Sequence, residues 1–356
     1  MVPKESQLRR FLRSGPGGVL LLLAIEVVVF SVWTQRISPT GEVTFLTARA
    51  ITSLLEATTI YAFLALAETP VMIAGGIDLS VGSTLALGQC VCAALITTDT
   101  VWRARSFPGL PGWVGVCGGV ATGALFGLVN GLLVATLRLP PFLLTLGMLS
   151  AGRGLAILLS RSSAIGSLPG HALPGDAYAS AEPVALFERF GKPNLSALRL
   201  GPVDLYFPTI VLLVLAAAMV LLLTRTRMGR AAYATGGNEE AARLAGLPVR
   251  ATKILLYSLC GAIAGTAGVM SAYQYGTFDP QAGMGYELGA IAACVLGGVS
   301  LTGGVGGVAG PLLGALLFAA LRKGLNQTGV GGEWSELAAG SVIVAAVVID
   351  RWRRGR

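Results

Sequence analysis

A polar, glycine-rich stretch separates two long apolar segments in the first quarter of the chain. Residues 75–88 read Gly-Gly-Ile-Asp-Leu-Ser-Val-Gly-Ser-Thr-Leu-Ala-Leu-Gly. An acid such as Asp78 costs about 2.5–3.5 kcal/mol at the centre of a membrane helix. Irregular backbone at that depth persists only where it is buried in protein or lines a watery cavity. The stretch therefore predicts a pathway through a membrane rather than an inert anchor.

Polar side chains elsewhere in apolar segments are candidates for lining the same pathway. We hypothesise that Glu68 and Asp78 face the path and hydrogen-bond to substrate hydroxyls or to water. The alternative is that Glu68 forms a structural ion pair with Arg153 between helices. The complete set of path candidates is Glu68, Asp78, Ser80, Asn130, Arg153 and Glu287.

The residue patterns that would make the chain an enzyme are missing from the sequence. The Gly-Lys pair at Gly191-Lys192 is followed by Pro193, so no phosphate-binding loop of the Gly-x-x-x-x-Gly-Lys-[Ser/Thr] type exists. There is one histidine, and the five cysteines show no Cys-x-x-Cys spacing. We therefore expect no catalytic residue, no cofactor and no metal ion.

Composition identifies a membrane protein. Of the 356 residues, 54% are hydrophobic and 12% are charged, against roughly 25% charged in soluble domains. The net charge of +8 comes from basic residues at segment ends, as the positive-inside rule predicts, and not from a nucleic-acid-reading motif. The 49 glycines suit closely packed membrane helices.

Ten segments are apolar enough for membrane helices, although one is short for the roughly 20 residues that a span needs. They cover approximately 17–34, 50–73, 80–98, 112–136, 141–160, 205–224, 253–274, 286–300, 306–325 and 335–350. We expect an all-α membrane protein with a single polytopic domain over 1–356, in which glycine-rich segments break some helices.

Charge distribution predicts the orientation of this domain. Basic residues cluster near the N-terminus, in the loop 225–252 and at the C-terminus. All three clusters lie in the cytoplasm if ten spans start from an inside N-terminus. The polar stretch 161–204 is then an external loop.

Within 225–252 the sequence predicts a short helix outside the membrane. Asn238 can cap the start of Glu239-Glu240-Ala241-Ala242-Arg243-Leu244, and Gly246-Leu247-Pro248 can end it. Such a helix is either a solvent-exposed connector between two spans or a docking element that binds a partner protein.

Residues 297–304 (Gly-Gly-Val-Ser-Leu-Thr-Gly-Gly) echo residues 75–82 (Gly-Gly-Ile-Asp-Leu-Ser-Val-Gly). The echo indicates either an internal repeat, as in many transporters, or a chance match in a glycine-rich chain. The expected topology places both breaks on the same face of the membrane.

Several motifs resemble ABC importer permeases. Glu240-Ala241-Ala242-x-x-x-Gly246 resembles the core of the coupling loop of these permeases. Residues 76–83 are similar to the signature of the ribose/xylose/galactofuranose branch. Further similar segments follow in the same order at 130–134, 139–147, 152–156, 236–238, 286–288 and 296–306.

The resemblance implies the transmembrane subunit of an ATP-driven importer of a monosaccharide or related polar solute, in a bacterial inner membrane. The implied partners are two cytoplasmic ATP-binding subunits, a second permease copy or paralogue, and an extracytoplasmic sugar-binding protein. Coupling to the ATPase would fall to Glu239, Glu240, Ala241, Ala242, Arg243 and Gly246.

The chain departs from the family pattern at two positions, and both put the substrate in doubt. Ala67-Glu68 replaces the usual Gly-Met, and Gly289 replaces the usual acid after Tyr-Glu-Leu. The alternative function is an ion-driven secondary transporter that acts without an ATPase, with Glu56, Glu68 and Asp78 as ion sites.

Overall fold

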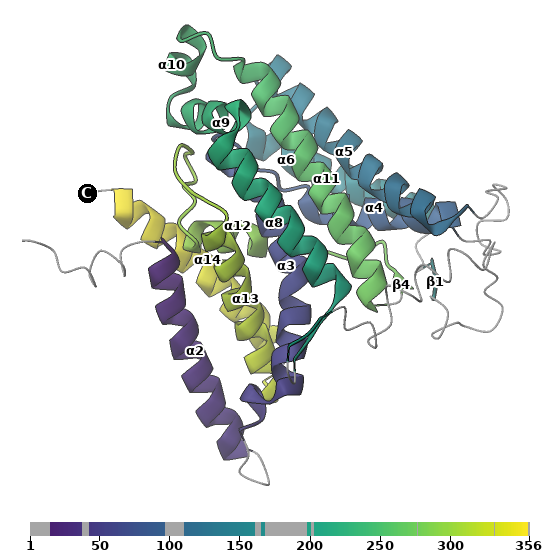
Figure 1. Cartoon of the computed structure of the whole chain (residues 1–356), viewed down its shortest axis with the longest axis vertical. Coiled ribbons are helices and arrows are strands. Elements are labelled where there is room, and N and C mark those ends of the chain that lie inside the picture. The colour runs from purple at the N-terminus through teal and green to yellow at the C-terminus, as the bar shows by residue number, and fades with distance from the viewer. Residues whose placement is uncertain are drawn as a thin grey trace, which may run out of the picture.

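A computed structural model describes residues 15–37, 43–96, 110–160, 165–167, 198–200, 203–275, 277–330 and 332–354 as a helical bundle (Figure 1). The first helices are α2 (Gly15–Ile37), the 3-10 turn η1 (Thr44–Leu46), α3 (Ala48–Ile73), α4 (Val81–Ile96), α5 (Gly112–Leu137) and α6 (Pro141–Ser160). The later ones are α8 (Phe207–Arg225), α9 (Arg227–Gly237), α10 (Glu239–Leu244), α11 (Val249–Tyr275), α12 (Tyr286–Leu296), α13 (Ala309–Gln327) and α14 (Gly332–Arg354).

Every one of the ten predicted membrane segments holds a helix, which confirms the all-α membrane fold. Six of these helices, α2, α3, α5, α6, α8 and α11, are long and apolar enough to span a bilayer. Shorter apolar helices occur at α4, α12 and within α14. Helix α12 ends at Leu296, before the predicted limit of 300, because the chain turns at Gly298 with a φ of 93°.

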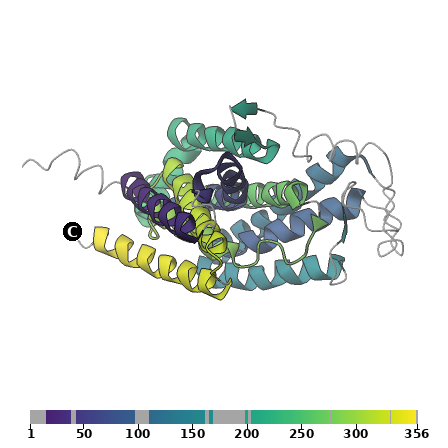
Figure 2. The same ribbon diagram turned by 90° about the horizontal axis from the view of Figure 1, so that it is seen from below.

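The helices form two groups that meet at α3. Helices α4, α5, α6 and α11 pack together on one side, and α2, α12, α13 and α14 lie on the other (Figure 1). Helix α3 packs against both α11 and α13, and the middle of it, with Phe63, Leu64 and Leu66, is fully buried. Figure 2 shows α14 along the outer edge of the bundle.

Small residues allow a close helix contact between α5 and α11. A Cβ atom added to Gly261 of α11 would lie 2.1 Å from the carbonyl oxygen of Gly123 on α5. Backbones this close exclude any larger side chain, as in many membrane helix pairs. The abundance of glycine in the sequence therefore has a packing role here.

Four short strands lie at the loops. Strand β1 (Ile165–Ser167) pairs antiparallel with β4 (Thr277–Phe278), and β2 (Leu198–Leu200) pairs antiparallel with β3 (Val203–Leu205). Apart from these strands, the expected external loop 161–204 lies outside the described residues, as do the basic residues before Gly15.

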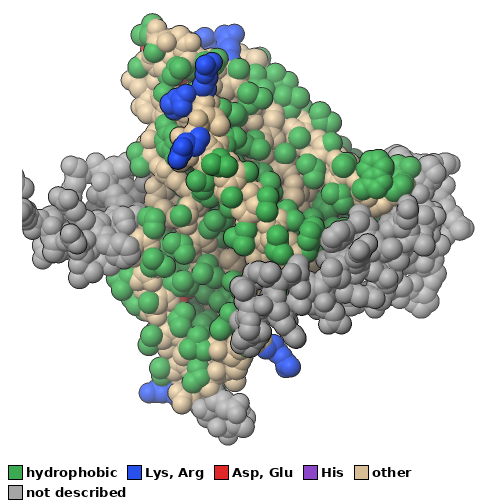
Figure 3. Space-filling model, viewed as in Figure 1, with side chains coloured by type: hydrophobic (Ala, Val, Ile, Leu, Met, Phe, Trp, Pro, Cys, Tyr) green, Lys and Arg blue, Asp and Glu red, His purple; other side chains and the backbone are tan. Residues whose placement is uncertain are grey.

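The surface agrees with a membrane-embedded molecule. On the face seen in Figure 3, Lys and Arg side chains gather at the two ends, and apolar side chains cover much of the flanks between them. The start of α2 lies near the end of α8, because Pro16, Leu223 and Tyr233 line the same cavity. Figures 1 and 2 also place the end of α14 near the start of α2.

Candidate transport path and coupling surface

The break between α3 and α4 carries a buried polar cluster. Helix α3 contains Pro70 and ends at Ile73, and Gly75 follows with a φ of 80°, which glycine tolerates best. The chain stays non-helical until Val81 begins α4. Gly75 is exposed, but residues 78–80 of this irregular backbone are buried, as a break at membrane depth requires.

Asp78 is the centre of the cluster. Its Oδ1 atom accepts hydrogen bonds from the backbone N–H of Ser80 at 2.9 Å and from the Ser80 hydroxyl at 2.5 Å. The side-chain amide of Asn130, on α5, donates to both carboxylate oxygens at 3.3 and 3.2 Å, and to Ser80 Oγ at 2.8 Å. Short polar contacts therefore tie the break to α5.

Glu68 completes the cluster without a cation. Its Oε2 atom accepts a long hydrogen bond of 3.4 Å from the backbone N–H of Asp78. Within the described part of the chain, Glu68 Oε1 and Asn130 Oδ1 have no hydrogen-bond partner. An unsatisfied buried polar atom costs about 1–3 kcal/mol, so these atoms are places where a hydroxyl or a water would be favourable.

In this conformation the cluster is closed to solvent. Glu68, Ser80 and Asn130 are 0% exposed and Asp78 is 1% exposed. Four of the six predicted path residues thus lie together, but a solute can reach them only if the surrounding helices separate. Their role in the path stays a prediction.

Two further side chains, which the sequence analysis did not select, hold the break in place. The carbonyl oxygen of Ile77 accepts hydrogen bonds from Thr145 on α6 at 3.2 Å and from Tyr257 on α11 at 3.3 Å. The signal in the sequence is weak, because single hydroxyl groups on apolar helices usually bond to their own helix. Thr145 also bonds to Pro141 of its own helix.

The remaining two path candidates lie elsewhere. Arg153 on α6 donates to the carbonyl oxygens of Pro280 and Ala282 at 2.7 and 2.8 Å. The hypothesis that Arg153 pairs with Glu68 is therefore wrong, because the Arg153 guanidinium instead donates hydrogen bonds to backbone carbonyl oxygens between β4 and α12. Glu287, at the start of α12, lies against Gly82 of α4.

The short helix predicted within 225–252 is present as α10. Asn238 Oδ1 accepts from the N–H of Ala241 at 2.9 Å, and Gly246 ends the helix with a φ of 78°. Of the predicted coupling residues, Glu239, Glu240, Ala241, Arg243 and Gly246 are exposed and Ala242 is buried. Leu244, an apolar residue of this polar helix that the sequence analysis did not select, is 80% exposed.

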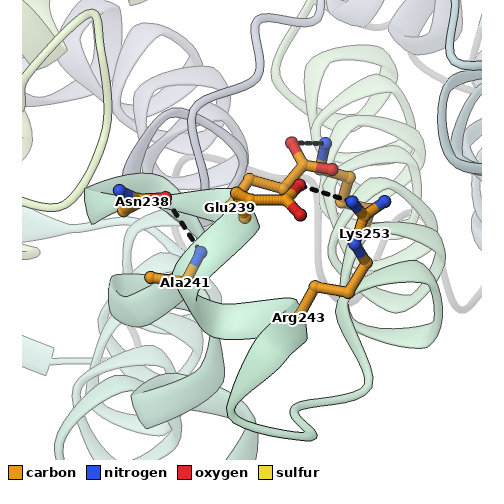
Figure 4. A network of polar contacts seen from close by, with 6 residues as sticks. Asn238, Glu239, Ala241, Arg243 and Lys253 are labelled. Atoms are coloured by element: carbon orange, nitrogen blue, oxygen red, sulfur yellow. Dashed lines mark hydrogen bonds and ion pairs between the residues drawn. The ribbon is translucent and has the colours of Figure 1, made fainter.

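Charged side chains fix α10 against α11 (Figure 4). Glu239 forms an ion pair of 2.6 Å with Lys253 of α11, and Arg243 pairs with Glu240 within α10. The hydrogen bond that Arg243 donates to the Glu240 carboxylate raises the pKa of Arg243 above its usual value, so Arg243 keeps its charge. The Glu239–Lys253 ion pair therefore links α10 to the start of α11.

Helix α9, which the sequence analysis did not predict, joins the coupling segment to both glycine-rich breaks. Gly304 donates its backbone N–H to the carbonyl oxygen of Ile73 at 2.8 Å, so the two breaks are in direct contact. A Cβ atom on Gly236 would lie 1.9 Å from that Ile73 oxygen and 2.5 Å from Gly304 N. The Tyr233 hydroxyl donates to the carbonyl oxygen of Gly306 at 2.9 Å.

Comparison with known proteins identifies the family. A family model described as "Branched-chain amino acid transport system / permease component" matches residues 50–347. The chain belongs to this permease family. No solved structure matches it.

Relatives of this permease handle several sugars according to their names. The ribose import permease protein RbsC of Escherichia coli (strain K12) is 35% identical, over 92% of each chain. The L-arabinose ABC transporter permease protein AraH of Azospirillum brasilense is 36% identical, over 96% of this chain and 91% of its own. The xylose transport system permease protein XylH of Haemophilus influenzae is 34% identical, over 93% and 95%. These relatives confirm the predicted resemblance to ABC sugar permeases.

Proposed function

We propose that the chain is the transmembrane subunit of an ATP-driven importer of a monosaccharide or a related small polar solute. It forms the translocation path, and it hydrolyses no nucleotide itself. Its relatives of 34–36% identity are named as ribose, arabinose and xylose permeases, and they match it over almost its full length. They differ in sugar, so the class of solute is proposed and the particular sugar is not.

One observation carries the proposal more than any other. The segment that precedes the exposed helix α10 is in backbone contact with both glycine breaks, and one break carries Asp78. Force applied to α10 from outside the bundle would move Gly236 against Ile73. That motion would pull on the Asp78 cluster and could open it, which is alternating access driven by a partner.

The partners follow from the same surface and from the family. One ATP-binding subunit would dock on Glu239, Glu240, Arg243 and the exposed Leu244 of this chain, and a second would dock on a second permease copy or paralogue beside it. A binding protein would deliver the sugar from the opposite side of an inner membrane. The start of α2 lies near Tyr233 of α9, which supports a cytoplasmic N-terminus if α9 and α10 face the cytoplasm.

The second candidate function is an ion-driven transporter, which the structure supports through one observation. Glu68 and Asp78 are buried together, and neither forms an ion pair within the described residues. Carboxylates without a cation in a membrane protein mark proton or sodium sites in many transporters. Glu56, the third predicted ion site, lies instead nearer the start of α3, where its backbone carbonyl accepts from Gln274.

Co-purification tests the proposed coupling. A tagged chain isolated from its native host should co-purify with an ATP-binding subunit. The variant Leu244→Glu should no longer co-purify with that subunit. Leu244 is the most exposed large apolar side chain of the described residues, and a charge at the centre of a docking surface costs several kcal/mol. Arg227→Gln on α9 is the control and should retain the subunit. Equal recovery of the subunit with Leu244→Glu would exclude α10 as the docking site.

A further inference from the structure

Beside α10 lies a cavity to which the proposed transport function assigns no ligand. It has a volume of about 760 Å³ and lies between the end of α5, the start of α6, α10 and the start of α11. Its walls carry four basic side chains, Arg138, Arg243, Arg250 and Lys253, and one acid, Glu239. The charge of the lining is therefore strongly positive.

Two of these basic side chains are free to bind a ligand. Glu239 pairs with Lys253, and Glu240 pairs with Arg243. Arg138 and Arg250 are exposed, and neither has an ion pair or a side-chain hydrogen bond within the described chain. Arginine presents a planar fork of N–H donors that suits the oxygens of a phosphate group.

Exposed apolar side chains lie next to the cavity, at the end of α5 and the start of α6. Leu137 ends α5, and Phe142 and Leu143 lie in the first turn of α6; all three are more than half exposed. Leu139 and two prolines, Pro140 and Pro141, line the cavity itself. A ligand that fills this site would thus meet arginines at one end and exposed apolar side chains at the other.

We propose that this cavity binds the headgroup of an anionic phospholipid, whose phosphodiester lies between Arg138 and Arg250 and whose acyl chains lie along Leu137, Phe142 and Leu143. Free phosphate shares the phosphate chemistry but would leave the apolar side chains without a role. Basic pockets at the ends of membrane helices are known to take such headgroups. Since Glu239, Arg243 and Lys253 also line the cavity, a bound lipid touches the helix that is proposed to receive the ATPase.

Binding of a short-chain fluorescent phosphatidylglycerol to the purified full chain in detergent tests the proposal. A basic side chain at a membrane surface contributes about fivefold to the affinity for anionic lipid. The variants Arg138→Gln and Arg250→Gln should each weaken binding about fivefold, and the double variant about 25-fold. The matched control Arg227→Gln/Arg230→Gln removes the same charge from exposed positions on α9 and should stay within about twofold.

Two competition measurements identify the ligand. Phosphatidylcholine and inorganic phosphate should both fail to displace the probe. Displacement by inorganic phosphate would show a free-phosphate site and overturn the lipid assignment. Unchanged lipid binding in a double variant that unfolds at the normal temperature would also overturn it. If the double variant binds lipid normally but no longer co-purifies with the ATPase, the lipid assignment is also overturned, because Arg138 and Arg250 would then belong to the protein interface.

Discussion

Replacement of Gly236 by alanine tests the contact between the coupling segment and the glycine breaks. The new Cβ atom would lie 1.9 Å from the Ile73 carbonyl oxygen and 2.5 Å from the Gly304 nitrogen. Ordinary contacts begin near 3.4 Å, so the end of α9 must move away from the Ile73 oxygen by about 1.5 Å. Both neighbouring atoms belong to the backbone and to a mutual hydrogen bond, so they cannot simply rotate away.

The energetic cost follows from the overlap. An added methyl group in a closely packed core costs about 1–3 kcal/mol. If that strain falls on the contact that couples α10 to the path, the coupling weakens by roughly 5- to 150-fold. We expect ATP-driven uptake in proteoliposomes with the ATPase and binding protein to fall within this range. ATP hydrolysis should fall less, because the ATPase site itself is untouched.

The neighbouring glycine provides the control. A Cβ atom on Gly237 would meet nothing within 4 Å, although it lies in the same last turn of α9. Gly237→Ala therefore changes helix propensity in the same way without the overlap. If Gly236→Ala and Gly237→Ala are expressed equally and transport equally, the contact between Gly236 and Ile73 does not couple α10 to the path. Equal damage in both variants would assign the effect to the helix end and not to the contact.

Substitutions at three further positions test the polar groups inside the bundle. Glu68→Gln keeps the shape and removes the charge, and we expect uptake to fall at least about tenfold with normal expression; normal uptake would remove Glu68 from the path. Asn130→Leu deprives the Asp78 carboxylate of a donor and should lower the free energy of unfolding in detergent by about 1–2 kcal/mol, and an unchanged unfolding midpoint would contradict the hydrogen bonds. Arg153→Gln should make the chain near Pro280 and Ala282 more sensitive to protease, whereas Arg153→Lys should restore part of the resistance; equal cleavage of Arg153→Gln and the wild type would contradict this contact.

Local signals predicted much of the fold. Runs of apolar residues were sufficient to locate a helix in each of the ten predicted segments, six of which are long and apolar enough to span a bilayer, whose thickness sets the length of a span. Asn238 and Gly246 predicted both ends of α10, since a side-chain cap and a left-handed glycine act within a few residues. Helix α9 was missed because its sequence, Arg227–Gly237, is rich in glycine and charge, and its buried Ala231 and Ala232 gain their stability from tertiary packing.

The candidate site was predictable only where it is local. Asp78 and Ser80 lie two residues apart, so their contact could be expected from sequence, whereas Asn130 reaches them from a helix 52 positions away. Opposite charge suggested Arg153 as the partner of Glu68. The structure places carbonyl oxygens closer to that guanidinium, and no pattern of charges in the sequence reports where backbone carbonyls will lie.

The central claim is that this permease moves solute only when an ATPase acts on α10. Sugar uptake should be measured in proteoliposomes that contain the purified chain alone, under proton and sodium gradients, and then with the ATPase, ATP and binding protein added. The account predicts no uptake by the chain alone and ATP-dependent uptake by the complete system. Gradient-driven uptake by the chain alone would contradict it and would favour the ion-driven transporter.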